Sequence, residues 1–290
     1  MIPKPLSSPT DTILVTGSGG LLGSELVDAL GARAGCRVIG VGHAQVEIAD
    51  PGSVAAFLDE TRPTVLVNAA GYTAVDRAES ERALAYRGNV TGPKVLAEAC
   101  SARGVKLIHY STDQVFDGRK GRPYREEDPV GPLNYYAVTK EEGEREALRA
   151  PRALVLRVQW LYGRLRDRFT PLAGMQSYGM FIDQFGAPTW AGDIARWTLE
   201  LLRRDSSGVF HAVYDDYASW AEIFEFVKAE CGYTVKLVPG RTADAGLPAA
   251  RPEFSVLANA KLRAELGVET LGGWRKPLAR FLAEKRRDGG

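Results

Sequence analysis

The stretch that decides the fold lies near the start of the chain and reads Ile13-Leu14-Val15-Thr16-Gly17-Ser18-Gly19-Gly20-Leu21-Leu22-Gly23. It opens with an apolar, β-branched run that is typical of a buried strand. Gly17, Gly20 and Gly23 then recur at every third position, a spacing that allows a tight turn, close approach of backbone amides to a pyrophosphate and close packing of the next helix. A loop that merely needs positive φ angles is the alternative. The strand before it and the helix after it favour a dinucleotide-binding turn formed by residues 17–23.

The first 160 residues alternate between strand-like and helix-like patterns. Short apolar runs, suited to strands that are buried on both faces, cover Thr12–Thr16, Arg37–Val41, Thr64–Val67, Val105–Tyr110 and Ala153–Val158. Segments with helical spacing lie between them at Leu21–Ala34, Pro51–Glu60, Ala78–Ala102 and Tyr135–Arg149. This alternation is typical of right-handed βαβ units. We therefore predict an α/β fold with a Rossmann-type, doubly wound parallel sheet.

The regular alternation ends after about residue 160. The segment Arg164–Gly179 has no clean period and contains Pro171 and two glycines, which predicts a loop or an irregular helix. Helical patterns return at Asp193–Arg204, Trp220–Glu230, Asn259–Leu266 and Trp274–Lys285, with strand-like runs at Val209–Val213 and Thr234–Val238. We expect residues 1–160 to form the dinucleotide-binding Rossmann domain and residues 161–290 to form mainly a smaller substrate-binding lobe, with interleaved boundaries.

Composition narrows the class of protein. The chain has 290 residues, of which 37 are Lys or Arg and 36 are Asp or Glu, so its net charge is only +1. This balance argues against a dedicated nucleic-acid or membrane-surface binder, which needs a basic field. No apolar run reaches the roughly 18 residues of a membrane span, and the first residues lack the apolar core of a signal peptide. Three distant cysteines predict a protein of a reducing compartment, the cytoplasm, and three scattered histidines predict no metal site. A monomer or a homodimer is expected.

The second predicted strand bears on the choice of cofactor. It ends in Ile39-Gly40-Val41-Gly42-His43, without the acid that usually binds the ribose 2′-hydroxyl of NAD. The missing carboxylate removes repulsion against a 2′-phosphate, and His43 or Arg33 could lie near that group. NADP(H) is therefore the preferred cofactor, with NAD(H) possible. In the Glu47-Ile48-Ala49-Asp50 run that follows, Glu47 or Asp50 could meet the adenine; the alternative is capping of the next helix, which has proline at its first position.

The third predicted strand runs into Asn68-Ala69-Ala70-Gly71-Tyr72-Thr73. Small residues at the carboxyl end of a strand leave room for a flat ligand, and a parallel sheet binds its ligands at this end. Tight packing at a turn is the alternative. We expect Ala69, Ala70, Gly71 and Thr73 to contact the cofactor.

The residues best suited to catalysis follow the fourth predicted strand. That strand ends in Ser111-Thr112-Asp113-Gln114, and Tyr136-Ala137-Val138-Thr139-Lys140 comes about twenty residues later. Tyr and Lys at positions i and i+4 share one helix face. The ammonium there can lower the pKa of the phenol from about 10 toward neutrality, so that Tyr136 exchanges a proton with a carbonyl or alcohol oxygen. Thr112 can bond the same oxygen. Tyr135, the rival phenol, has Thr139 instead of a lysine four residues on.

These motifs together resemble the extended short-chain dehydrogenase/reductase superfamily, and most closely its dTDP-4-dehydrorhamnose reductase family. The superfamily match consists of Gly17-x-x-Gly20-x-x-Gly23, Asn68-Ala-Ala-Gly71 and Tyr136-x-x-x-Lys140. The longer, family-specific match adds Asn68–Asp76 with Ala78-Glu-Ser80, Tyr110-Ser-Thr-Asp-Gln-Val-Phe-Asp-Gly118, Pro132-Leu-Asn134, Asp183–Trp190 and Arg251-Pro-x-x-Ser255 with Lys261-Leu262. In two places the chain differs from the family's pattern, at Gln114 and between residues 163 and 183.

The resemblance implies a role for each matching residue. Thr112 and Tyr136 would hold the keto oxygen of a sugar, Tyr136 would donate the proton, and Lys140 would also bind the nicotinamide ribose. Tyr110 would lie at the cofactor. The substrate, a nucleotide-linked 6-deoxyhexose with a 4-keto group, would meet a further set of residues, namely Asp113, Gln114, Trp160, Gln184 and Arg251. The resemblance favours dTDP-4-dehydro-L-rhamnose as the substrate, reduced to dTDP-L-rhamnose.

Other readings remain open. One is a 4-ketoreductase for another nucleotide deoxysugar. An epimerase or dehydratase is disfavoured because Asp113-Gln114 lacks the adjacent Asp-Glu pair of the dehydratases. A third is a non-catalytic regulatory subunit of the same fold, which the intact Thr112, Tyr136 and Lys140 set argues against. Tryptophans on predicted helices, such as Trp220, are expected to serve packing only.

Overall fold

A computed structural model describes residues 12–33 and 36–287 of the chain, and the side chain of Arg33 lies outside the description, as do the N-terminal tail and Ala34. Its core is a six-stranded sheet in the order β10-β5-β4-β3-β1-β2, in which every pairing is parallel. The strands are β1 (Thr12–Thr16), β2 (Arg37–Val41), β3 (Val65–Asn68), β4 (Lys106–Thr112), β5 (Leu154–Val158) and β10 (Gly208–Ala212). The predicted doubly wound parallel sheet is confirmed.

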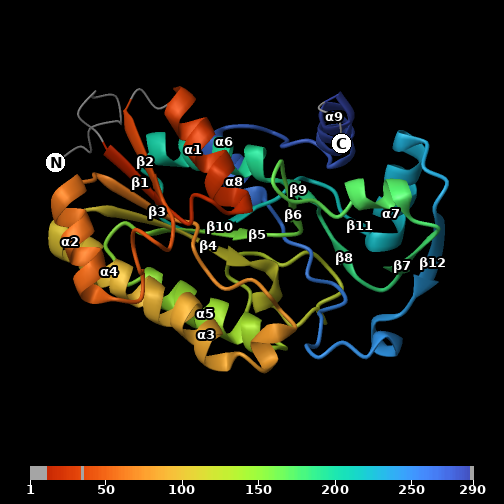
Figure 1. The fold of residues 1–290 in the computed structure, drawn as a ribbon, viewed down its shortest axis with the longest axis horizontal. Helices are drawn as coiled ribbons and strands as arrows, with labels where there is room; N and C mark the ends of the chain where they lie inside the picture. Colours follow the sequence, from red (N-terminus) through yellow and green to blue (C-terminus); the bar gives the residue numbers. More distant parts are fainter. Residues whose placement is uncertain (1–11, 34–35, 288–290) are drawn as a thin grey trace.

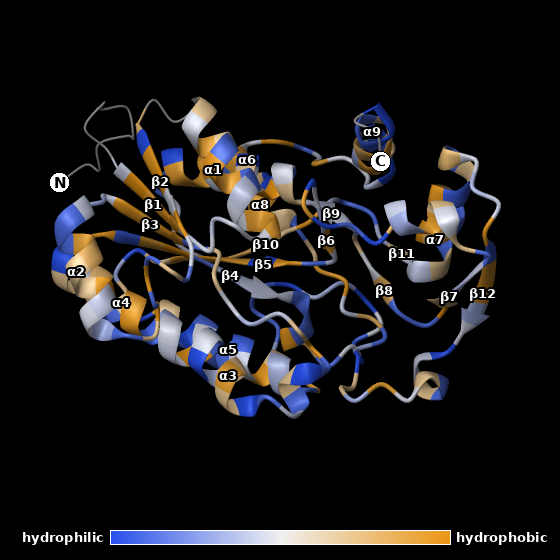
Figure 2. Ribbon diagram, in the orientation of Figure 1, coloured by the Kyte–Doolittle hydropathy of each residue, from blue (hydrophilic) through white to orange (hydrophobic). Residues whose placement is uncertain are grey.

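Helices cover both faces of this sheet (Figure 1). On one face α1 (Leu21–Arg33), α6 (Ala191–Arg203) and α8 (Ala260–Leu266) share an apolar core with residues of β1, β3, β4, β5 and β10. On the other face α2 (Pro51–Thr61), α4 (Gly92–Arg103) and α5 (Tyr135–Ala147) pack against the alternate residues of the strands. Figure 2 shows hydrophobic residues along the central strands between these helix layers. Asp50 caps α2 ahead of Pro51, as its position indicated.

A smaller lobe is built mostly from the second half of the chain (Figure 1). Its aromatic-rich core lies among the elements α7 (Trp220–Cys231), α9 (Arg275–Arg287), β7 (Ser177–Phe181) and β12 (Lys236–Gly240). Two short strand pairs join the lobe to the sheet, β6 (Leu161–Tyr162) with β9 (Thr189–Trp190) and β8 (Phe185–Gly186) with β11 (Ala218–Ser219). Strand β10 and helix α6 come from this half of the chain but belong to the main sheet and its helix layer.

The structure corrects three expectations about local structure. Strand β2 is an edge strand that is partly exposed, so it is not buried on both faces. The helix expected over Ala78–Ala102 is instead a short 3₁₀ turn, α3 (Arg82–Tyr86), a π-helical turn at Arg87–Thr91 and then α4. The segment expected to be loop or irregular helix ends in strand β7, which forms by pairing with β12, nearly sixty residues later in the chain.

No helix among the described residues has both the length and the apolar composition needed to cross a membrane. Nor do residues 12–33 and 36–287 bring together three or more His, Cys, Asp or Glu side chains in a way that suits a metal ion.

Candidate active site

The glycine turn connects β1 to α1 at the carboxyl edge of the sheet. Gly17 has φ +68°, and a Cβ there would lie 2.6 Å from the backbone nitrogen of Ala70, so only glycine fits. A Cβ on Gly23 would lie 2.0 Å from the carbonyl oxygen of Gly17, which is the close helix packing that the spacing predicted. Gly20 instead borders a cavity. The three glycines therefore serve three different physical needs.

A cavity of about 500 Å³, here called the sheet-edge cavity, opens where β1, β3 and β4 end. Many of the predicted site residues line it, namely Gly20, Leu21, Leu22, Ala69, Ala70, Gly71, Thr73, Tyr110, Thr112, Asp113, Gln114, Tyr136, Lys140 and Trp160. It lies at the carboxyl ends of β1 and β3, between which the order of the strands in the sheet changes direction. A parallel sheet binds its ligands at such a switch point. Residues predicted from four separate motifs thus meet in one space.

Other predicted cofactor residues do not line this cavity. Gly17, Ser18, Gly19 and Gly23 form the turn behind it, and the Ser18 amide donates to the Val41 carbonyl. A second group that does not line the cavity follows β2 and comprises His43, Glu47 and Ile48.

The residues of that second group are occupied elsewhere. The His43 side chain is 83% exposed and lies 3.7 Å from the Glu47 carboxylate, which is also 3.5 Å from the Arg87 guanidinium. Ile48 is buried, and its side chain fills the space above Gly92 at the start of α4. The structure therefore gives Ile48 a packing role.

Tyr136 and Thr112 both line the sheet-edge cavity, and both are more than nine-tenths buried. The Thr112 hydroxyl donates a 3.1 Å hydrogen bond to Asp113 Oδ1 and accepts one of 3.2 Å from the Gln114 amide. Asp113 is itself held, because Gln159 Nε2 donates to its Oδ2 at 2.8 Å and the Ser255 hydroxyl does so at 2.5 Å. These bonds fix the Thr112 hydroxyl beside the Tyr136 phenol.

Lys140 lies one turn after Tyr136 on α5 and is also buried. Its Nζ donates a 2.6 Å hydrogen bond to the carbonyl oxygen of Tyr110 on β4. It also lies 4.0 Å from the position that a Cβ on Gly71 would occupy. Burial lowers the pKa of Lys140 to about 8, while the carboxylate of Glu144 acts in the opposite direction.

The acidity of Tyr136 differs from the sequence-based expectation. Burial raises the pKa of Tyr136 to about 12, although its hydrogen bond with Thr112 acts in the opposite direction. The predicted lowering by Lys140 is wrong for this structure, because the ammonium is directed to the Tyr110 carbonyl instead of the phenol. A phenol with this pKa stays protonated at neutral pH, which suits a proton donor.

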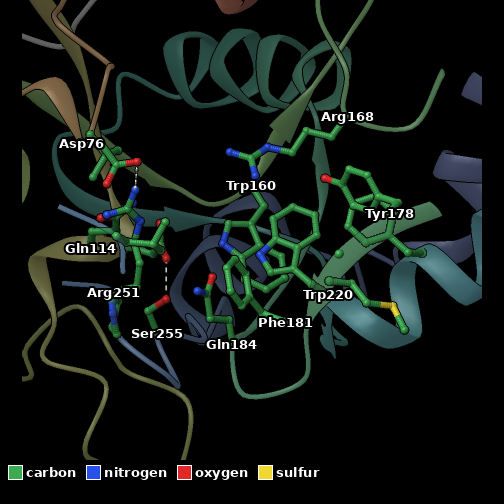
Figure 3. A pocket seen from close by; sticks show the side chains of 17 residues that line it. Asp76, Gln114, Trp160, Arg168, Tyr178, Phe181, Gln184, Trp220, Arg251 and Ser255 are labelled. Atoms are coloured by element: carbon green, nitrogen blue, oxygen red, sulfur yellow. Dashed lines mark hydrogen bonds and ion pairs between the residues drawn. The ribbon is translucent and has the colours of Figure 1, made fainter. Parts of the chain in front are cut away.

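A second cavity of about 230 Å³, here called the lobe cavity, adjoins the first. The two share five lining residues, Asp113, Gln114, Trp160, Arg168 and Trp220. Figure 3 shows the predicted residues Gln184 and Arg251 among its walls. The Arg251 guanidinium pairs with the Asp76 carboxylate at 3.0 Å and donates to the Ala249 carbonyl. All the residues predicted to meet the substrate, and part of those predicted to meet the cofactor, therefore line two adjoining cavities.

Sequence reasoning missed several residues of the site. Trp220 was assigned to packing alone, but it borders both cavities and stacks on Trp160 with ring centroids 4.0 Å apart. Arg168 borders both cavities as well. Asn89, in the π-helical turn, accepts a hydrogen bond from the Tyr72 amide and donates to the Tyr72 carbonyl and to Thr139. It thereby ties the loop after β3 to α5. Because π-helical turns are frequent at functional sites, this turn marks Asn89 as a candidate site residue once the structure is known.

Comparison with known proteins agrees with this geometry. The family model of the RmlD substrate binding domain matches residues 11–287. A curated dTDP-4-dehydrorhamnose reductase of Streptomyces griseus is 37% identical, over 93% of this chain and 92% of its own length. A probable dTDP-4,6-dihydroxy-2-methyloxan-3-one 4-ketoreductase of Streptomyces antibioticus is 38% identical, over 91% of this chain and 92% of its own.

A solved structure shows the same fold along nearly the whole chain. The dTDP-4-dehydrorhamnose reductase of Bacillus anthracis, in complex with NADP, superposes with a TM-score of 0.90 at 28% identity, covering 95% of this chain and 99% of its own. The extent of the family match and the identity to curated relatives agree with the motifs around Gly17, Thr112 and Tyr136. The chain belongs to the family of the RmlD substrate binding domain, the dTDP-4-dehydrorhamnose reductases among the extended short-chain dehydrogenases/reductases.

Proposed function

We propose that this protein is an NADPH-dependent reductase of a nucleotide-linked 4-keto-6-deoxyhexose, with dTDP-4-dehydro-L-rhamnose as its substrate and dTDP-L-rhamnose as its product. The observation that carries the proposal is the meeting of Tyr136, Thr112 and Lys140 in a cavity that continues into a second one. The names of the curated relatives support the sugar. The proposal assigns the cofactor to residues 1–160 and the substrate mainly to residues 161–290.

The sheet-edge cavity fits a nicotinamide dinucleotide. Its volume of about 500 Å³ lies within the range of ligand sites, and it begins at the N-terminus of α1, where partial positive charge favours phosphate. Ser111 lines this cavity, and its buried Oγ has no hydrogen-bond partner among the described residues, so it is available to a polar ligand. Gly20, Ala69, Ala70 and Lys140 would hold the cofactor there. The relative from Bacillus anthracis was solved with NADP, which supports the same choice here.

NADPH fits this site better than NADH because Glu47, the first acidic residue after β2, already has other partners. The Glu47 carboxylate accepts from the Ala49 amide at 2.9 Å and lies close to Arg87 and His43. It is therefore poorly placed to accept the ribose 2′-hydroxyl that distinguishes NADH binding.

The residues of the chain position the ketone and supply a proton. Bound NADPH supplies the hydride. The hydroxyls of Thr112 and Tyr136 donate to the keto oxygen, on which negative charge develops during reduction. Tyr136, protonated at neutral pH, then gives its proton to that oxygen. The Lys140 ammonium donates to the Tyr110 carbonyl and not to the phenol, so it favours the phenolate only through its positive charge one helix turn away. The Thr112 hydroxyl, which donates to Asp113 Oδ1 in the structure, turns its single proton to the keto oxygen when the substrate binds.

Replacing Gly20 with valine should weaken binding of both NADPH and NADH by roughly 10- to 100-fold, which is the value of about one hydrogen bond to a charged group. The side chain would occupy space that a pyrophosphate needs at the cavity wall. Titration of cofactor fluorescence measures the effect. Gly31→Val on α1 is the matched control, because Gly31 is exposed, a Cβ there meets nothing within 4 Å and Gly31 does not line the cavity. Equal losses in the two variants would contradict the placement of the pyrophosphate.

The test of the proposed function is a panel of nucleotide-linked 4-keto sugars. Each is incubated with NADPH or NADH, cofactor oxidation is followed by absorbance, and the product's stereochemistry is determined. We expect turnover of dTDP-4-dehydro-L-rhamnose with NADPH, and a lower rate with NADH. The relative from Streptomyces antibioticus, named for a different keto sugar, makes a 4-ketoreductase of another deoxysugar the second candidate. Turnover of another sugar alone would establish that candidate, and turnover of none would refute the reductase.

We also propose that the protein is a cytoplasmic enzyme that acts as a monomer or homodimer. Cys100 and Cys231 form no disulfide among the described residues, and burial raises the pKa of the Cys100 thiol to about 12, so that it is unreactive. Free cysteines are typical of proteins from a reducing compartment.

A further inference from the structure

Arg168 is an exposed arginine that borders both cavities of the site. It comes from the segment before β7 and reaches the junction of the two cavities, both of which it lines. Figure 3 shows it extending over Trp160 toward the middle of the site. Its guanidinium carbon lies 5.3 Å from the centroid of the Trp220 ring. Among the residues that the structure describes, no carboxylate forms an ion pair with it.

The other arginines of the site differ from it. Arg251 also lines the lobe cavity, but its charge is compensated by Asp76 at 3.0 Å. Arg166 borders the sheet-edge cavity only. Arg168 is therefore the one cation of these three that borders the lobe cavity without a carboxylate partner.

A cation in such a place calls for an anion. Arg168 is exposed at the cavities, and the neighbouring protein lowers its pKa by desolvation, although a guanidinium stays charged in proteins. Leaving the charge unpaired in a partly dehydrated site costs free energy that an anionic ligand would recover. The planar guanidinium suits phosphate oxygens, which it can bind through two parallel hydrogen bonds.

The walls of the lobe cavity indicate which anion. Its walls include the aromatic side chains of Tyr178, Phe181, Trp220 and Phe224. Aromatic side chains suit the flat face of a nucleobase. Thr112 and Tyr136, at the position of the reacting sugar, border the sheet-edge cavity and not the lobe cavity. A ligand with its base among the aromatic residues and its sugar at Tyr136 would carry the linking diphosphate beside Arg168.

We propose that Arg168 binds the diphosphate of the nucleotide-sugar substrate and thereby sets the distance between base and sugar. The proposal rests on the proposed function for the identity of the substrate. It assigns an anchoring role to the segment between residues 163 and 183, in which this chain differs from the family's usual pattern. A phosphate of the cofactor is the other anion in reach, because Arg168 borders the sheet-edge cavity too.

The experiment measures binding without turnover, so that it does not depend on the reduction. Isothermal titration calorimetry compares thymidine, dTDP and NADPH on the wild type and Arg168→Gln. We expect the variant to lose about 10- to 100-fold in affinity for dTDP, in line with the loss of hydrogen bonds to a charged group. Affinity for thymidine and for NADPH should be unchanged. Arg166→Gln is the matched control, and its affinity for dTDP should equal that of the wild type.

Each other outcome has a definite meaning. Unchanged dTDP affinity in Arg168→Gln overturns the proposal, and so does a loss confined to NADPH, which would assign Arg168 to the cofactor. If Arg168→Gln does not fold, Arg168→Lys replaces it, with an intermediate loss for dTDP expected and no loss contradicting the proposal. A wild type that binds dTDP through Arg168 but reduces no keto sugar would refute the proposed function and leave the diphosphate site standing.

Discussion

The Tyr136→Phe variant is expected to lower kcat by about 10²- to 10⁴-fold, the usual value of proton transfer from a positioned group. The buried phenol beside Thr112 is the proposed proton donor, and its high pKa keeps it protonated at neutral pH. Affinity for NADPH should survive, because the variant keeps the ring that lines the cavity and loses only the hydroxyl. Steady-state NADPH oxidation and a fluorescence titration measure the two effects.

Tyr135→Phe provides the matched control, since it removes the same hydroxyl one position earlier. The Tyr135 ring lies under the Arg82 guanidinium, at 4.7 Å, and does not line either cavity. Its kcat should therefore stay near that of the wild type. Near-normal turnover in Tyr136→Phe would show that the proton comes from Tyr135, Asp113 or water, and the assignment of the donor would have to be abandoned.

The Lys140→Met variant should lose both turnover and cofactor affinity, because we propose that the Lys140 ammonium favours the phenolate and binds the nicotinamide ribose. We expect a loss in kcat/KM at least as large as that of Tyr136→Phe, in the range of about 10²- to 10⁴-fold. The same kinetic assay and a fluorescence titration of NADPH measure the two losses. Lys94→Met, which changes an exposed lysine on α4, is the control and should be silent.

Lys140 should also give the wild type a pH dependence. Burial lowers the pKa of this lysine to about 8, so it is charged below that pH and neutral above it. The kcat/KM should therefore be steady below about pH 8 and fall as the pH rises further. Lys140→Met should lack this decline, and a decline that persisted in the variant would assign the titration to another group.

Much of the fold could be predicted because its signals are local. The run from Ile13 to Gly23 contains its strand, turn and helix start within eleven residues, and the roles of Gly17 and Gly23 follow from short backbone distances. Asp50 and Pro51 mark the start of α2 for the same reason. Tyr136 and Lys140 were found together because one helix turn separates them.

The features that could not be predicted depend on distant partners. Strand β7 has no β-branched residue and contains Gly179, so only its pairing with β12 makes it a strand. The position of Arg168 depends on how the segment before β7 packs against Trp220, which lies more than fifty residues later in the chain. The Glu47 carboxylate lies 3.5 Å from the Arg87 guanidinium, forty residues later in the chain, and the sequence at the end of β2 gives no sign of that contact.

The contribution of β10 and α6 to the main sheet bears on how the molecule can come apart. Strand β10 pairs with β5 along its whole length, and α6 buries its apolar face against α1 through residues such as Ile194 and Leu199. A fragment ending near residue 160 would leave β5 as an open edge and the inner face of α1 exposed to water. Both halves should therefore melt in one cooperative transition, and the boundary between cofactor and substrate binding is no place to cut the chain into independently stable pieces.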